Sequence, residues 1–96
     1  MMKKDNLYQF KDVRKSLDII DSQINNLIGK RFNEIHKVAK LKKGQDQIID
    51  HERITHILKT VKAKAKKEKI DSEIVVRIWQ IFIQEAIKLE YSKIKN

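Results

Sequence analysis

Three basic side chains, Arg14, Arg31 and Lys42, interrupt an apolar stripe that begins at Phe10. The stripe recurs in alternating steps of four and three residues, which is the spacing of one face of a long helix. A charge on a buried face costs several kcal/mol unless it finds a partner, water or a ligand. Arg31 and Lys42 lie about 20° apart around an ideal helix and about 16 Å apart along it. Both can therefore reach one anion between them, although each can also extend to water or pair with a nearby acid.

A carboxylate, Glu90, interrupts a second apolar face near the other end of the chain. This face carries Trp79, Ile83, Ala86 and Ile87 at helical spacing. Glu90 is therefore either a surface acid close to a helix C-terminus or a functional group on a buried face.

The patterns of other catalytic sites are absent from the sequence. Without cysteine there is no thiolate nucleophile, no disulfide and no cysteine-based zinc site. His51 and His56 are five residues apart, which is not the i, i+4 pair of a helical zinc site, and His36 stands alone. No glycine-rich loop is present to hold a phosphate. We therefore expect neither a metal nor a cofactor.

The elements that position these residues are predicted to be helices. The chain has 96 residues, no proline and two glycines, too few turn residues for a sheet protein of this size. We expect an all-α fold in a single domain, 1–96, with residues 1–9 as a frayed N-terminus. The first helix is predicted over Lys11–Lys43, ended by Gly44. The second and third helices are predicted to begin after the N-cap residues Asp50 and Asp71.

The length of the first helix predicts a dimer. Its 33 residues would form a rod of about 50 Å, whereas a compact chain of this size is only about 32 Å across. Two shorter helices cannot cover the apolar stripe of such a rod from end to end. We therefore expect an intertwined homodimer in which the long helices of two chains pack together.

The composition indicates the kind of partner only in general terms. Lys and Arg outnumber Asp and Glu by 22 to 13, which favours an anionic partner without identifying it. The lysine run from Lys62 to Lys69 is typical of a solvated helix face. No apolar run is long enough for a membrane span, and the N-terminus lacks the apolar stretch of a signal peptide. We expect a cytoplasmic protein with no membrane partner.

The segment from Val13 to Ile24, VRKSLDIIDSQI, together with Arg31 and Lys42, resembles the first helix of the all-helical chorismate mutases and the related isochorismate pyruvate lyases. The segment DHER, residues 50–53, resembles the box that opens the family's second helix. The resemblance extends from about Val13 to Lys93. It implies a homodimer with shared active sites, a small dianionic substrate, either chorismate or isochorismate, and a reaction that needs no cofactor.

The resemblance also implies residue roles. Arg14 would bind a substrate carboxylate in the partner's pocket, and Arg31 would bind a carboxylate in its own chain's pocket. Lys42 would donate to the ether oxygen and to an adjacent carboxylate, and Glu90 would also contact the ether oxygen. Glu52 would hold the ring hydroxyl. An ionised carboxylate cannot donate a hydrogen bond, so Glu90 would have to be protonated in the active form.

The remaining site residues implied by the resemblance form the wall of the pocket. These apolar residues are Val38, Ile83, Ala86 and Ile87. His51 stands where the family has proline or, in some mutases, a substrate-binding arginine, and we include it among the substrate-binding residues.

Two kinds of alternative remain at this stage. The short loop between Lys42 and Glu52 is closer to the lyases, whereas the small Ala86 favours the mutases. We favour a mutase that converts chorismate to prephenate, with the lyase reaction, isochorismate to salicylate and pyruvate, as the alternative. A second alternative is a non-catalytic basic helical module that binds nucleic acid or protein. A nucleic-acid partner is disfavoured because Arg14 and Arg31 belong to the apolar stripe rather than to an outward face.

Overall fold

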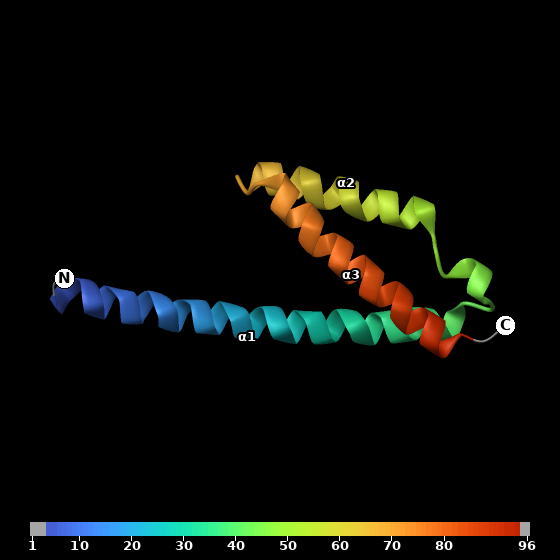
Figure 1. The fold of residues 1–96 in the computed structure, drawn as a ribbon, viewed down its shortest axis with the longest axis horizontal. Helices are drawn as coiled ribbons and strands as arrows, with labels where there is room; N and C mark the ends of the chain where they lie inside the picture. Colours follow the sequence, from blue (N-terminus) through green and yellow to red (C-terminus); the bar gives the residue numbers. More distant parts are fainter. Residues whose placement is uncertain (1–3, 95–96) are drawn as a thin grey trace. The chain divides into compact units, whose positions relative to one another are not determined.

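A computed structural model describes residues 4–94, apart from the side chains of residues 4 and 5. Helix α1 spans Lys4–Leu41, a short 3-10 helix η1 spans Gln45–Gln47, α2 spans His51–Lys67 and α3 spans Ser72–Lys93 (Figure 1). All regular structure within residues 4–94 is helical. The predicted all-α fold of three helices with a long first helix is confirmed.

Helix α1 differs from its prediction at both ends. It begins at Lys4, so residues 4–9 are helical rather than frayed, and residues 1–3 lie outside the described part. It ends at Leu41 rather than Lys43. Gly44 does not cap it in a left-handed conformation, because its φ of −157° and ψ of 166° are those of extended chain. Lys42 therefore follows the helix, although its backbone N–H still donates to the Val38 carbonyl at 3.1 Å.

The chain divides into two compact units, residues 1–33 and residues 34–96. The described part of the first unit is the N-terminal stretch of α1 alone. Its large apolar side chains are about half exposed, for example Phe10 at 49%, Leu17 at 49% and Ile24 at 47%. The single domain expected from the chain length stays a prediction.

In the 34–96 unit, α2 and α3 pack side by side. Both N-caps are as predicted: Asp50 Oδ1 accepts from Arg53 N at 3.0 Å, and Asp71 Oδ1 accepts from Glu73 N at 2.9 Å. The turn between the helices includes Lys69 in the left-handed region, with φ of 59°. Each aspartate satisfies an N–H that has no partner within its helix, which explains why both helices begin where they do.

The C-terminal turn of α2 is closed by a Schellman motif. Ile70 N donates to the Ala65 carbonyl at 2.8 Å, and Lys69 N donates to the Lys66 carbonyl at 3.2 Å. These bonds use carbonyls that the end of a helix leaves unpaired. The motif turns the chain into α3 within four residues, 68–71.

A small apolar cluster joins the last turns of α1 to the end of α3 within the 34–96 unit. It contains the buried Ala39, Ile48 and Ile94, with Ile87 packed against them. Ile48 comes from the loop after η1, and Ile94 is the C-cap of α3. The cluster therefore holds this loop, and the residues beside it, against the C-terminal end of α3.

No helix in the described range 4–94 is both long enough and apolar enough to cross a membrane.

Candidate functional site

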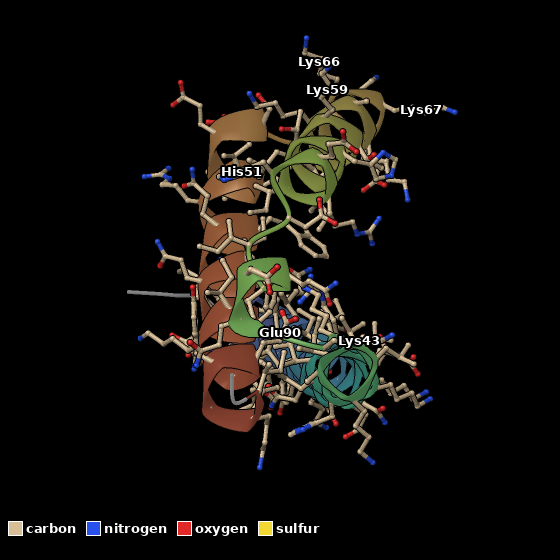
Figure 2. All side chains as sticks on the ribbon, turned by 90° about the vertical axis from the view of Figure 1, so that its right-hand side faces the viewer. Lys43, His51, Lys59, Lys66, Lys67 and Glu90 are labelled. Atoms are coloured by element: carbon tan, nitrogen blue, oxygen red, sulfur yellow. The ribbon has the colours of Figure 1, made fainter. Side chains whose placement is uncertain are left out.

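Lys42 and Glu90 form an ion pair in the 34–96 unit, in which Glu90 is buried and Lys42 is half-buried. Lys42 Nζ lies 2.7 Å from Glu90 Oε1, and the two side chains are 20% and 6% exposed. Lys42 comes from the chain just after α1, and Glu90 comes from the last turn of α3. Figure 2 shows Glu90 beside the loop that carries Lys43. The sequence named both residues for one site, and the fold brings them together across 48 residues of chain.

The ammonium of Lys42 is also anchored to the backbone, because Nζ donates to the Ile48 carbonyl at 3.1 Å. Its contact with Glu90 has the distance of an ion pair but not the alignment of a hydrogen bond, and Glu90 Oε1 accepts no hydrogen bond from the described residues. A buried carboxylate with one charged neighbour and unused hydrogen-bonding capacity is costly. Such a group can still accept a hydrogen bond or, once protonated, donate one.

An open cavity of about 470 Å³ lies beside Lys42. It is lined by residues of the loop and of the first turn of α2, namely Lys42, Gln47, Ile49, Asp50, His51 and Glu52. Three of the predicted site residues, Lys42, His51 and Glu52, therefore share one cavity. Its lining carries two carboxylates, Asp50 and Glu52, and one ammonium, Lys42, so the lining alone does not favour an anionic substrate.

The predicted apolar wall residues do not line this cavity. Ile83 and Ala86 are buried, and Ile87 packs on the cluster of Ala39, Ile48 and Ile94. Ile83, Ala86 and Ile87 precede Glu90 by seven, four and three residues, so all three share its face of α3. Val38 is 37% exposed on α1.

The two predicted arginines belong to the 1–33 unit and are described with it. The Arg14 guanidinium lies over the Phe10 ring, 5.3 Å from its centroid, in the geometry of a cation–π contact. Arg31 is half-buried, with its Nη1 atom inaccessible to solvent. The roles of Arg14 and Arg31 in the site stay predictions.

Sequence reasoning missed the loop residues that hold the site in place. Gln45 Nε2 donates to the Ile94 carbonyl at 3.2 Å, and Gln47 Oε1 accepts from Lys43 N at 2.8 Å. The backbone carbonyl of Ile48 holds Lys42. Such a loop has no periodic pattern from which its contacts could be predicted. A backbone carbonyl can accept a hydrogen bond whatever the residue type, so the sequence does not indicate the role of Ile48.

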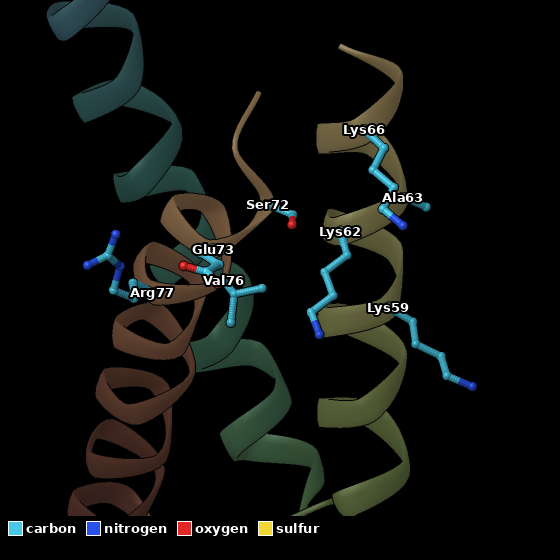
Figure 3. A pocket seen from close by; sticks show the side chains of 8 residues that line it. All are labelled: Lys59, Lys62, Ala63, Lys66, Ser72, Glu73, Val76 and Arg77. Atoms are coloured by element: carbon cyan, nitrogen blue, oxygen red, sulfur yellow. The ribbon is translucent and has the colours of Figure 1, made fainter. Parts of the chain in front are cut away.

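A second groove, of about 790 Å³, runs between α2 and α3 (Figure 3). Its basic side chains are Lys59, Lys62, Lys66 and Arg77, with Glu73 on the α3 side. Each of these side chains is exposed to solvent. Lys66 also lies in the last turn of α2, where a cation complements the negative end of the helix dipole. These observations fit the solvated face predicted for the lysine run, and no predicted site residue lines this groove.

Within residues 4–94, no three His, Asp or Glu side chains are grouped as metal ligands.

Comparison with known proteins adds two findings. A match to the family described as chorismate mutase type II covers residues 13–91. A chorismate mutase of Methanocaldococcus jannaschii is 31% identical over an alignment of 83 residues, and the match covers 83% of this chain and 84% of that protein. No solved structure gives a significant match. The family match includes every residue predicted for the site, from Arg14 to Glu90.

Proposed function

The chain belongs to the chorismate mutase type II family, so its activity is that of a chorismate mutase, an isomerase, and we propose that the reaction takes place beside the Lys42–Glu90 pair. The reaction rearranges chorismate to prephenate within one molecule. An ether bond breaks as a carbon–carbon bond forms, and negative charge develops on the ether oxygen. No nucleophile is required, which agrees with the absence of nucleophile motifs from the sequence.

The anchored ammonium of Lys42 carries this proposal. Its side chain is only one-fifth exposed, and its Nζ is fixed by the Ile48 carbonyl and Glu90 before any substrate arrives. A preorganised cation in a poorly hydrated place stabilises developing negative charge far better than one in water. We propose that Lys42 donates to the ether oxygen.

Glu90 is proposed as the second donor to the ether oxygen. Its ionised form can only accept hydrogen bonds, so it must take up a proton to play this part. The 6% exposure of its side chain supports the proposal by keeping competing water away.

The charges around Lys42 are not sufficient for a dianionic substrate. Around Lys42 lie the carboxylates of Asp50, Glu52 and Glu90. Further cations must therefore complete the site, and we assign this role to Arg31 of the same chain and Arg14 of a second chain. Each would bind one substrate carboxylate, a task suited to the forked guanidinium group.

A second copy of the chain is the proposed source of that Arg14. The half-exposed apolar row that includes Leu17 and Ile24 in the 1–33 unit supports this, because such a row gains stability when a partner covers it. We expect sedimentation equilibrium to give a dimer. Leu17→Asp should weaken it, whereas the control Ser22→Asp, with the same charge on the opposite helix face, should not. A monomeric wild-type protein would contradict the homodimer.

The other proposed contacts fix the substrate's pose. Glu52 would hold the ring hydroxyl and His51 a nearby carboxylate, supported by their position in the same cavity as Lys42. The apolar side chains proposed to pack on the substrate are Val38, Ile83, Ala86 and Ile87. Holding a flexible substrate in a reactive pose supplies part of the rate enhancement.

A cytoplasmic location is also proposed, supported by the cysteine-free composition.

A turnover assay tests the proposal. Purified protein should convert chorismate to prephenate, and a parallel assay of isochorismate, measuring salicylate and pyruvate, examines the lyase alternative. Lys42→Met should lower kcat by about 10²- to 10³-fold, the usual loss for one transition-state donor. The control Lys37→Met removes an exposed lysine paired with Glu34 and should be neutral. Wild-type turnover in folded Lys42→Met would contradict the proposed site.

A further inference from the structure

The position of the Lys42 ammonium depends on residues beyond the helix that precedes it. Lys42 follows the last residue of α1, and only its backbone N–H continues the helical hydrogen bonding, to Val38. Its side chain is directed by the Ile48 carbonyl, which accepts from Nζ at 3.1 Å. Whatever fixes the Ile48 carbonyl therefore fixes the ammonium.

The Ile48 carbonyl is held by η1 and by the apolar cluster. Ile48 N donates to the Gln45 carbonyl at 3.2 Å, and Gln47 N donates to the Gly44 carbonyl at 3.1 Å. The Ile48 side chain is 2% exposed and packs in the cluster with Ile94. Apolar contacts keep the loop close to α3 but do not fix its direction, because hydrophobic attraction is not directional.

The Gln45 side chain supplies a directional contact. Its Nε2 donates to the Ile94 carbonyl at 3.2 Å, across 49 residues of sequence and in a partly buried position. Ile94 is the C-cap of α3, and its own N–H donates to the Glu90 carbonyl at 2.8 Å. Gln45 thus joins the loop that directs Lys42 to the turn of α3 that carries Glu90.

We infer that Gln45 is a positioning residue for the reaction: its hydrogen bond to the Ile94 carbonyl sets the position of the Lys42 ammonium relative to Glu90. The inference rests on the proposed function, in which Lys42 and Glu90 act together on the ether oxygen. Gln45 acts only through these residues and does not line the cavity beside Lys42. Displacement of a catalytic group by about 1 Å is sufficient to slow an enzyme by up to about 100-fold.

A pair of substitutions separates the donor from the bulk of the side chain. Gln45→Met keeps the length but removes the donor, and we expect kcat to fall about 10-fold with KM changed less than about 2-fold. Gln45→Lys restores a donor of sufficient reach and should recover most of kcat. The control Gln84→Met makes the same exchange at an exposed position of α3 and should match the wild-type protein. Circular dichroism melting checks that each variant is folded.

An NMR measurement tests the inference without turnover. The ¹⁵N signal of the Lys42 ammonium, assigned by its loss in Lys42→Met, should be protected from solvent exchange in the wild-type protein and broadened in Gln45→Met. Unchanged kcat and an unchanged Lys42 signal in Gln45→Met would overturn the inference. An equal loss in Gln45→Lys would also overturn it, since the effect would then not depend on the donor. Absence of turnover in the wild-type protein would instead refute the proposed function, and the Lys42 signal would still decide the role of Gln45.

Discussion

Removal of Lys42 should destabilise the protein mainly because it leaves the Glu90 carboxylate buried without its partner. The Glu90 side chain is 6% exposed and lies 2.7 Å from the ammonium that Lys42→Met would remove. Loss of one member of a buried pair costs about 3–5 kcal/mol. The Lys42 side chain is one-fifth exposed, so water can reach the position it vacates. We therefore expect the lower end, a loss of about 3 kcal/mol in the free energy of unfolding.

The double variant Lys42→Met, Glu90→Met distinguishes this cause from lost packing. With both charges gone, no uncompensated charge remains, and apolar replacements of a buried pair are often close to neutral. We expect the double variant to lie within about 1 kcal/mol of the wild-type protein, so that the coupling energy in the cycle exceeds about 2 kcal/mol.

Urea unfolding followed by far-ultraviolet circular dichroism gives these free energies. Protomer concentration must be equal in all samples, because association of chains contributes to apparent stability. Lys37→Met, which breaks an exposed pair, is the matched control and should cost less than about 1 kcal/mol. Strictly additive effects of the two substitutions at Lys42 and Glu90 would refute the reasoning, because the two groups would then not compensate each other.

Two further predictions concern Glu90 and Lys69. Glu90→Gln should keep turnover, because an amide donates the hydrogen bond that Glu90 is proposed to donate, whereas Glu90→Met, which has no donor, should lower kcat by about 10²-fold. Rate measurements on both variants would show this, and an equal loss in both would exclude the role. Lys69→Gly should raise the free energy of unfolding by up to about 1 kcal/mol, because a side chain disfavours the left-handed conformation at this position. Urea titrations would measure the change. A loss of stability would show that the Lys69 side chain makes a compensating contribution.

Local chemistry made much of the fold readable from the sequence. Asp50 and Asp71 each precede an apolar helical pattern, and both cap their helices as expected. The ends of α1 were harder to predict from the sequence. Residues 4–9 continue the helix without a starting signal, and Gly44 has an extended conformation that a sequence cannot distinguish from a left-handed cap.

The candidate site could be predicted only in part from the sequence. Lys42 could be singled out because a cation on an apolar stripe requires a partner or a ligand. The periodicity of one helix, however, does not identify the acid that lies opposite it in the fold. Its assignment to one site with Glu90 came from the family resemblance, and the fold places the two side chains in contact. Gln45 acts through a backbone carbonyl 49 residues away, so neither its residue type nor its spacing revealed it.

The turn between α2 and α3 and the Lys42–Glu90 pair differ greatly in the chain entropy needed to form them. The turn closes over four residues, 68–71, whereas the pair closes over 48. Loop-closure entropy grows by about 0.6 kcal/mol for each doubling, so the pair costs about 2 kcal/mol more to bring together. Mild denaturant should therefore separate the charged groups while α2 and α3 remain paired. Turnover should accordingly be lost at lower urea concentrations than the helical signal, because the groups proposed for chemistry belong to the last contacts that folding completes.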